Sequence, residues 1–89
     1  MKKDKEVRAY IYILKCADNS FYTGWTVDLE KRLKTHNEGK GSKYTRGKRP
    51  VVLIYSESFS HRNDAMKREY QIKKLTRNQK EKLIKLSHL

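Results

Sequence analysis

Residues 9–16 form the segment that most restricts the fold of this chain. Their side chains are apolar on both alternating faces, with Tyr10, Tyr12, Leu14 and Cys16 on one and Ala9, Ile11 and Ile13 on the other. A strand that is apolar on both faces is typical of a sheet whose two sides are both covered. The pattern therefore predicts a central strand.

A second strand is predicted over residues 21–25, which are rich in aromatic side chains. Gly24 in this run lets another group approach the backbone closely. Residues 17–20 favour a hairpin turn, in which Asn19 tolerates the left-handed conformation. A loop with an odd number of residues places Tyr12 and Tyr22 on the same face, whereas a two-residue loop places them on opposite faces. The sequence leaves both registers open.

The charge of the chain restricts its partners. Its 89 residues contain 22 Lys and Arg against 10 Asp and Glu, which gives a net charge of +12. Such an excess destabilises a compact domain by self-repulsion, and an anionic partner relieves it. Nucleic acid is the leading candidate partner, and an acidic membrane surface is the second.

Cys16 is the single cysteine, so the chain has neither an internal disulfide nor a cysteine-rich zinc site. This usage suits a reducing compartment. No apolar run approaches membrane-spanning length, and the charged start does not resemble a signal peptide. We expect a disordered tail over residues 1–7 and one cytoplasmic domain over residues 8–87.

A helix is predicted over about residues 29–37, capped by Thr26 or Asp28 and ended by Gly39. Two of its polar residues, Arg32 and His36, flank the apolar stripe instead of facing solvent. Taken singly, each has an ordinary interpretation: an arginine at the edge of the core, and a packed, hydrogen-bonded neutral histidine. Their i, i+4 placement weakens that interpretation without reversing it.

Residues 39–50 form a basic loop with one helical turn around residues 42–45. The loop holds three of the four glycines and the only proline. Its glycine spacing does not match a Walker-type phosphate loop. Basic side chains, freed backbone N–H groups and an aromatic ring suit contact with nucleic acid, which we favour over a merely solvated loop. The candidate contact residues are Lys40, Lys43, Tyr44, Arg46, Lys48 and Arg49.

Residues 51–55 are continuously apolar and predict a third strand, central and buried, that ends at residues 56–60. A helix follows from residue 60 or 61 to about residue 75, and a capping box at residues 76–79 starts a last helix. The expected fold is a small α+β domain, whose three-stranded, mostly antiparallel sheet is flanked by helices.

Glu69 lies on the apolar face of the first of these two helices, together with Ala65 and Ile72. A carboxylate there is costly unless it is paired or binds a cation. An ion pair with Lys73, or with Arg62, is the ordinary explanation. Helix geometry alone favours neither interpretation of Glu69, the ion pair or the bound cation, over the other.

These motifs together resemble those of the GIY-YIG nuclease superfamily. The two signature elements are matched by Tyr10-Ile11-Tyr12 and Tyr22-Thr23-Gly24, and the arginine helix of the family by the segment around Arg32. Glu69 falls where the family has its single metal-binding glutamate. The match extends over about residues 10–84, and the nearest resemblance is to small stand-alone bacterial members.

The resemblance implies a metal-dependent endonuclease that acts on DNA, in repair or processing. Glu69 would hold one Mg²⁺ or Mn²⁺, and Tyr22 would act as, or help to position, the base that activates the attacking water. Arg32 would stabilise charge on the scissile phosphate. Tyr12 and His36 would orient the water or the phosphate.

Four positions depart from the family pattern. Tyr10 replaces a glycine and Thr23 an isoleucine, whereas Trp25 stands where repair-type members tend to carry a lysine. Asn78 is a candidate for the late asparagine of the family, although a plain helix-start residue fits its spacing better. The alternatives to a nuclease are a non-catalytic nucleic-acid-binding module with the same fold and a basic adaptor for an acidic protein.

Overall fold

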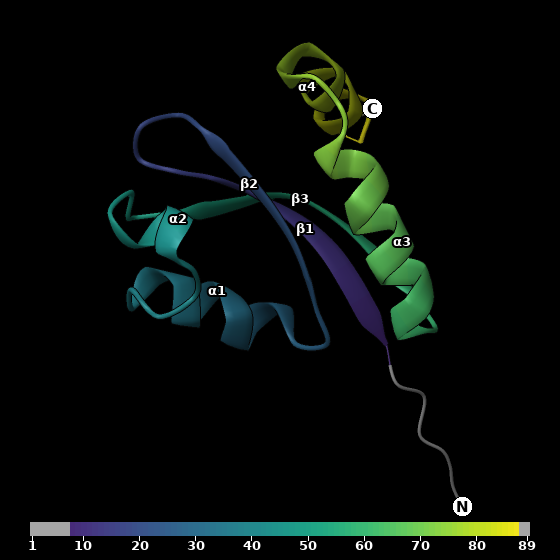
Figure 1. Cartoon of the computed structure of the whole chain (residues 1–89), viewed down its shortest axis with the longest axis horizontal. Coiled ribbons are helices and arrows are strands. Elements are labelled where there is room, and N and C mark those ends of the chain that lie inside the picture. The colour runs from purple at the N-terminus through teal and green to yellow at the C-terminus, as the bar shows by residue number, and fades with distance from the viewer. Residues whose placement is uncertain (1–7, 88–89) are drawn as a thin grey trace, which may run out of the picture.

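The computed structural model describes residues 8–87 (Figure 1). Its elements are β1 (Ala9–Lys15), β2 (Phe21–Thr26), α1 (Leu29–Asn37), α2 (Lys43–Arg46), β3 (Val52–Phe59), α3 (Arg62–Lys73) and α4 (Arg77–Leu86). They confirm the predicted α+β fold, a three-stranded sheet flanked by helices. The tail predicted for residues 1–7 lies outside the described residues. Within residues 8–87 no helix has the length and apolar character needed to cross a membrane.

The sheet has the order β2-β1-β3, and both neighbours of β1 run antiparallel to it. β1 is therefore the central strand, as its apolar pattern predicts. Leu14 pairs with Tyr22 across the hairpin, and the connecting residues 16–20 are odd in number. Asn19 has a φ of 70°, the left-handed conformation expected for it. Tyr12 and Tyr22 consequently share one face, with their ring centroids 6.4 Å apart.

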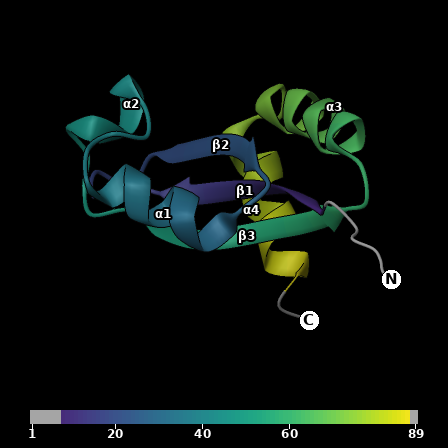
Figure 2. The same cartoon turned by 90° about the horizontal axis from the view of Figure 1, so that it is seen from below.

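Each face of the sheet carries its own apolar core. Figure 2 shows α1 and α4 on opposite sides of the strands. On the side of α3 and α4, the buried residues are Ala9, Ile11, Ile13, Ala65 and Ile72, with Trp25, Leu83 and Ile84 packed against them. On the side of α1, they are Tyr12, Leu14, Cys16 and Val51, with Tyr22, Leu29 and Leu33 packed against them. The layer that holds both tyrosines is thus separated from α3 by the sheet.

The third strand departs from the prediction. Residues 51–55 predict a central, buried strand, but β3 lies at the edge of the sheet, and Val52 and Leu53 are 53% and 39% exposed. The prediction was wrong because a continuous apolar run does not specify how many neighbours a strand has. The strand also continues to Phe59, beyond its apolar run, since residues 56–59 pair with the first half of β1.

α3 is attached to this edge strand by an ion pair. Arg68 donates from Nε to Glu57 Oε1 at 2.9 Å and from Nη2 to Oε2 at 3.0 Å, and Tyr55 donates to the same carboxylate. Burial and the bond to Glu57 raise the pKa of Tyr55 to about 12. Burial opposes the charge of Glu57, but the bonds from Arg68 and Tyr55 keep its pKa below the usual value. The cluster fixes α3 against the sheet.

The predicted capping box starts α4. The hydroxyl of Thr76 accepts a hydrogen bond from the backbone N–H of Gln79 at 3.2 Å, and the side chain of Gln79 accepts one from the N–H of Thr76 at 2.9 Å. Asn78 is an exposed residue in the first turn of α4, as the interpretation of a plain helix-start residue requires.

Candidate active site

α1 places Arg32 and His36 against the tyrosine face of the sheet. Asp28, one of the two predicted caps, accepts a hydrogen bond from the backbone N–H of Lys31 at 3.1 Å. Gly39 follows the helix with a φ of 83°, in the left-handed region that favours glycine. Both helix ends therefore lie where local signals predict them, one turn of helix separates Arg32 from His36, and both side chains reach Tyr12.

The His36 ring is completely buried between two hydroxyl groups. Its Nε2 lies 2.9 Å from Tyr12 Oη, and its Nδ1 lies 2.8 Å from Thr45 Oγ1. Burial, together with the positive charge of Arg32, lowers the pKa of His36 to about 4. His36 is therefore neutral near pH 7, and the interpretation of a packed, hydrogen-bonded histidine is confirmed.

Tyr12 joins this histidine to the arginine. The hydroxyl accepts a hydrogen bond from Arg32 Nε at 3.3 Å, and the residue is only 2% exposed. Burial is the main reason that the pKa of Tyr12 is raised, so the phenol keeps its proton. The ring crosses over Gly24, where a Cβ atom would lie 2.5 Å from Tyr12 Oη. The close approach predicted at Gly24 is thus made by Tyr12.

Arg32 is held at both ends of its guanidinium group. Nη2 donates to the carbonyl oxygen of Gly41 at 2.8 Å, while Nε donates to Tyr12. The bond to Tyr12 is the main cause that raises the pKa of Arg32, so the side chain stays cationic. In the part of the chain that the structure describes, no carboxylate lies within ion-pair distance of it. Its charge is available to an anion.

Tyr22 lies between the buried cluster and the solvent. Its ring centroid is 5.1 Å from that of His36, in an edge-on arrangement at 61°. On its other side the ring stacks on Tyr44, with centroids 5.9 Å apart and planes at 27°. Tyr44 is 43% exposed, and Lys48 Nζ lies 3.5 Å from the centroid of its ring. The rings of His36, Tyr22 and Tyr44 are therefore in contact one after another, from the buried histidine to the exposed basic loop.

Glu69 belongs to α3, in the other helical layer. Its side chain is 21% exposed and lies 3.4 Å from Lys73 Nζ, so the ordinary i, i+4 ion pair is present. Its charge nevertheless contributes to raising the pKa of Tyr12, after the larger effect of burial. The structure thus brings Tyr12, Tyr22, Arg32 and His36 together, whereas the charge of Glu69 acts on Tyr12.

Comparison with known proteins identifies this arrangement. The family model described as the GIY-YIG catalytic domain matches residues 8–82. The chain belongs to the GIY-YIG family. The resemblance deduced from the two tyrosine motifs, Arg32 and Glu69 is confirmed.

Several relatives in this family are similar to this chain over most of its length. The UPF0213 protein CPE1444 of Clostridium perfringens is 64% identical over 75 residues, which cover 84% of this chain and 81% of the relative. The UPF0213 protein YazA of Bacillus subtilis is 60% identical over 72 residues, which cover 81% of this chain and 73% of the relative. The solution NMR structure of the protein EF2693 from E. faecalis is 47% identical, with a TM-score of 0.62, and covers 99% of this chain and 92% of that one.

GIY-YIG nucleases in general use a divalent metal, and Glu69 is the residue expected from the sequence to bind it. Within residues 8–87 no three side chains of His, Cys, Asp and Glu come together. Mg²⁺ does not need such a set, because it commonly binds one or two carboxylates and completes its shell with water and substrate phosphates. Glu69 is partly exposed, and its partner Lys73 is a flexible surface residue that a cation can displace.

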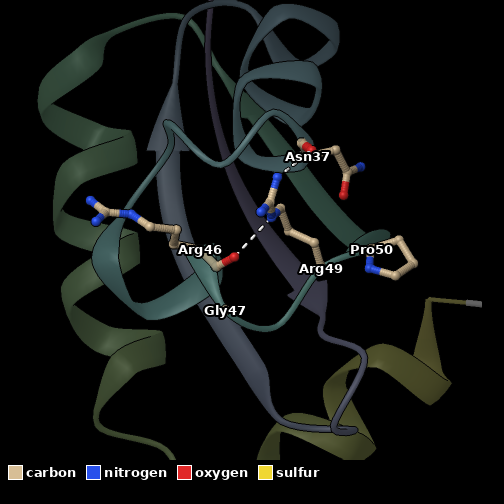
Figure 3. Close-up of a pocket in the computed structure, with 5 residues that line it drawn as sticks. All are labelled: Asn37, Arg46, Gly47, Arg49 and Pro50. Atoms are coloured by element: carbon tan, nitrogen blue, oxygen red, sulfur yellow. Dashed lines mark hydrogen bonds between the residues drawn. The ribbon is translucent and has the colours of Figure 1, made fainter.

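The candidate contact residues of the basic loop lie in three places. Tyr44 stacks on Tyr22, and Lys48 lies over the Tyr44 ring. Lys40, Lys43 and Arg46 are exposed at the surface. Figure 3 shows Arg49 in a separate pocket, its guanidinium directed at backbone carbonyls and the Arg46 side chain pointing away. Arg49 Nε donates to the carbonyl of Arg46 at 2.8 Å, and its Nη1 to that of Asn37 at 3.4 Å. Arg49 therefore fastens the loop to the end of α1.

Sequence reasoning missed two residues of the site, Gly41 and Thr45. Thr45 is completely buried at the centre of α2, and a Cβ atom at Gly41 would lie 2.2 Å from His36 Nδ1. The predicted helical turn did contain Thr45, and its cap, Ser42, accepts from the Thr45 N–H at 3.1 Å. Nothing in the sequence around Thr45, a small hydroxyl residue in a basic segment, indicates that it contacts His36.

Proposed function

We propose that this GIY-YIG protein is a metal-dependent endonuclease that hydrolyses phosphodiester bonds in DNA. The proposal depends above all on one observation: Arg32 and His36 both hydrogen-bond to the Tyr12 hydroxyl, and the Tyr22 ring packs against His36. Its basic surface suits a polyanionic substrate. DNA repair or processing is the corresponding biological setting.

Arg32 would stabilise the charge that develops on the scissile phosphate. Its guanidinium is already oriented by Tyr12 and by the carbonyl of Gly41, and no described carboxylate neutralises it. Preorganised donors of this kind lower a barrier because they need no rearrangement as charge develops. The neutral His36 and the protonated Tyr12 would hold this donor and orient the phosphate or the water.

Tyr22 would take the proton of the attacking water or position that water. Its ring lies between the buried His36 and the exposed Tyr44, which supports a place for Tyr22 next to the bound substrate. Glu69 would hold one Mg²⁺ or Mn²⁺, whose chemistry when bound is Lewis-acid stabilisation of phosphoryl oxygens and a lowered pKa of water. Trp25 packs in the core on the α3 side, so no lysine assists Tyr22 from that position.

The basic loop would bind the DNA backbone near this site. Lys40, Lys43 and Arg46 are exposed and can contact phosphates, while Tyr44 can stack on a base next to Tyr22. Lys48 Nζ lies over the Tyr44 ring and 3.7 Å from Asp18 Oδ2, so Lys48 would contact a phosphate next to the base that stacks on Tyr44.

A non-catalytic nucleic-acid-binding module is the second candidate function. The observation that favours it is the ion pair between Glu69 and Lys73, which satisfies the carboxylate without a metal. This function predicts DNA binding that does not depend on Glu69.

Cleavage of labelled DNA separates the two functions. Single-stranded, duplex and branched oligonucleotides are incubated with the protein and with Mg²⁺, Mn²⁺ or EDTA. The test variant is Glu69→Gln, and the matched control is Glu81→Gln, which breaks another i, i+4 ion pair, with Arg77 in α4. A nuclease requires metal-dependent cutting that Glu69→Gln removes and Glu81→Gln retains. Binding without cutting of any substrate would leave the binding module.

A further inference from the structure

A continuous chain of hydrogen bonds passes through the centre of the site. It runs from Arg32 Nε to Tyr12 Oη at 3.3 Å, then to His36 Nε2 at 2.9 Å, and from His36 Nδ1 to Thr45 Oγ1 at 2.8 Å. Beyond Thr45 it reaches the hydroxyl of Ser42 at 3.0 Å and the carbonyl of Ser42 at 3.5 Å. Thr45 is therefore the only described side chain that bonds to the far nitrogen of His36.

The direction of this chain follows from the needs of Tyr12. The hydroxyl already accepts a hydrogen bond from Arg32, and it is buried, so its own proton requires an acceptor. His36 Nε2 is the described acceptor within reach. A neutral imidazole that accepts at Nε2 carries its proton on Nδ1. Nδ1–H then donates to Thr45 Oγ1, and Thr45 can pass its own proton to Ser42.

The loop before α2 packs closely around the His36 ring. A Cβ atom at Gly41 would lie 2.2 Å from His36 Nδ1, and Thr45 is completely buried. The same loop accepts the Arg32 guanidinium through the Gly41 carbonyl. Residues 41–45 thus hold both Arg32 and His36, from the side opposite to Tyr12.

We propose that Thr45 is a positioning residue: by accepting a hydrogen bond from Nδ1–H, it stabilises the His36 tautomer in which Nε2 accepts from the Tyr12 hydroxyl. Tyr12 Oη is thereby left with its lone pairs directed at Arg32, which keeps the guanidinium in place for the phosphate. Tyr44 and Arg46, two of the proposed DNA contacts, flank Thr45 on α2. The kinetic part of this inference rests on the proposed nuclease function; the tautomer does not.

The tautomer is measured first, by ¹⁵N–¹H correlation of the imidazole ring in uniformly labelled protein. The wild type is expected to show a protonated Nδ1 and an unprotonated Nε2 for His36. The opposite pattern in the wild type would overturn the proposal, whatever any variant does. This readout needs neither DNA nor metal, so it is independent of the nuclease proposal.

Variants then separate positioning from simple filling of space. Thr45→Val keeps the shape but removes the acceptor, so the His36 pattern should change, whereas Thr45→Ser restores the hydroxyl and the wild-type pattern. Thr35→Val is the matched control on α1, where the Thr35 hydroxyl donates to the carbonyl of Lys31 in the same helix. An unchanged pattern in folded Thr45→Val would refute the role of Thr45. If Thr45→Val fails to fold, loss of the pattern in Thr45→Ser would refute it instead.

Single-turnover cleavage completes the test. The rate constant of Thr45→Val should fall by about tenfold, the effect of one lost orienting hydrogen bond, with unchanged DNA affinity. Thr45→Ser should recover most of the rate. An altered tautomer with a wild-type rate would refute the kinetic part. Absence of cleavage by the wild type would instead refute the proposed function, and the tautomer result would stand by itself.

Discussion

Lowering the pH should destabilise the fold through His36 in particular. The ring is completely buried, and its pKa is about 4 in the folded protein, against about 6.5 for an unperturbed histidine. Between these two values the unfolded chain binds a proton that the folded protein does not. Stability contributed by the neutral ring is therefore fully present above about pH 6.5 and is lost as the pH falls toward 4.

The size of this effect follows from the two pKa values. Linkage gives a loss of about 2 kcal/mol at pH 5 and a limit of about 3 kcal/mol in more acidic solution. Such a loss is a large fraction of the roughly 5–15 kcal/mol by which small domains are stable. It should therefore be visible as a clear shift of the unfolding midpoint.

Urea unfolding of the wild type and His36→Gln at pH 7 and pH 5 measures the effect. His36→Gln should be the less stable protein at pH 7 but should lose about 2 kcal/mol less than the wild type on going to pH 5. Carboxylates titrate in both proteins, so their contribution cancels in this difference. His61→Gln, at the exposed start of α3, should lose as much as the wild type. Parallel losses in the wild type and His36→Gln would refute the reasoning.

Three further predictions concern the basic loop of residues 39–50. Gly41→Ala should destabilise the protein by about 1–3 kcal/mol in urea unfolding, because the added Cβ would overlap the His36 ring. Gly47→Ala is the control and should not destabilise it, because a Cβ there has nothing within 4 Å. Equal effects of the two substitutions would contradict the close packing of Gly41 against His36. Lys43→Ala should flatten the slope of log affinity for DNA against log salt by about 0.7–0.9, in a fluorescence anisotropy titration, and an unchanged slope would remove Lys43 from the binding surface. Arg49→Ala should instead mainly lower stability, since its guanidinium is bound to backbone carbonyls.

Local sequence signals predicted the elements that depend on local physics. The cap at Asp28, the stop at Gly39 and the capping box at Thr76 act within one helical turn, and each is found where expected. The double apolar pattern of residues 9–16 predicted the central strand because burial on both faces leaves no polar side.

Features set by distant contacts were not predictable in the same way. The shared face of Tyr12 and Tyr22 depended on the loop length, which the sequence left open. The edge position of β3 depends on which strands pair, and this is not written in its own apolar run. Thr45 meets His36 only because the loop folds back over α1, so its role became visible only in the structure.

Glu69 shows a third kind of limit. Its place on an apolar face indicated either an ion pair or a cation, and the structure contains the ion pair with Lys73. The Lys73 side chain is half exposed, and i, i+4 pairs on a helix surface typically contribute only about 0.3–0.5 kcal/mol, so the pair is weak. The two interpretations therefore do not exclude each other.

The most direct measurement of the central claim is the single-turnover cleavage rate of DNA by the wild type, Tyr22→Phe and Tyr44→Phe. These two tyrosines stack with ring centroids 5.9 Å apart, so each variant removes one hydroxyl from one of two neighbouring rings. We expect Tyr22→Phe to bind DNA normally and to lose cleavage, and Tyr44→Phe to cut at nearly the wild-type rate. Cutting by Tyr22→Phe at the wild-type rate, or none by the wild type in Mg²⁺ or Mn²⁺, would contradict a nuclease whose chemistry is centred on Tyr22.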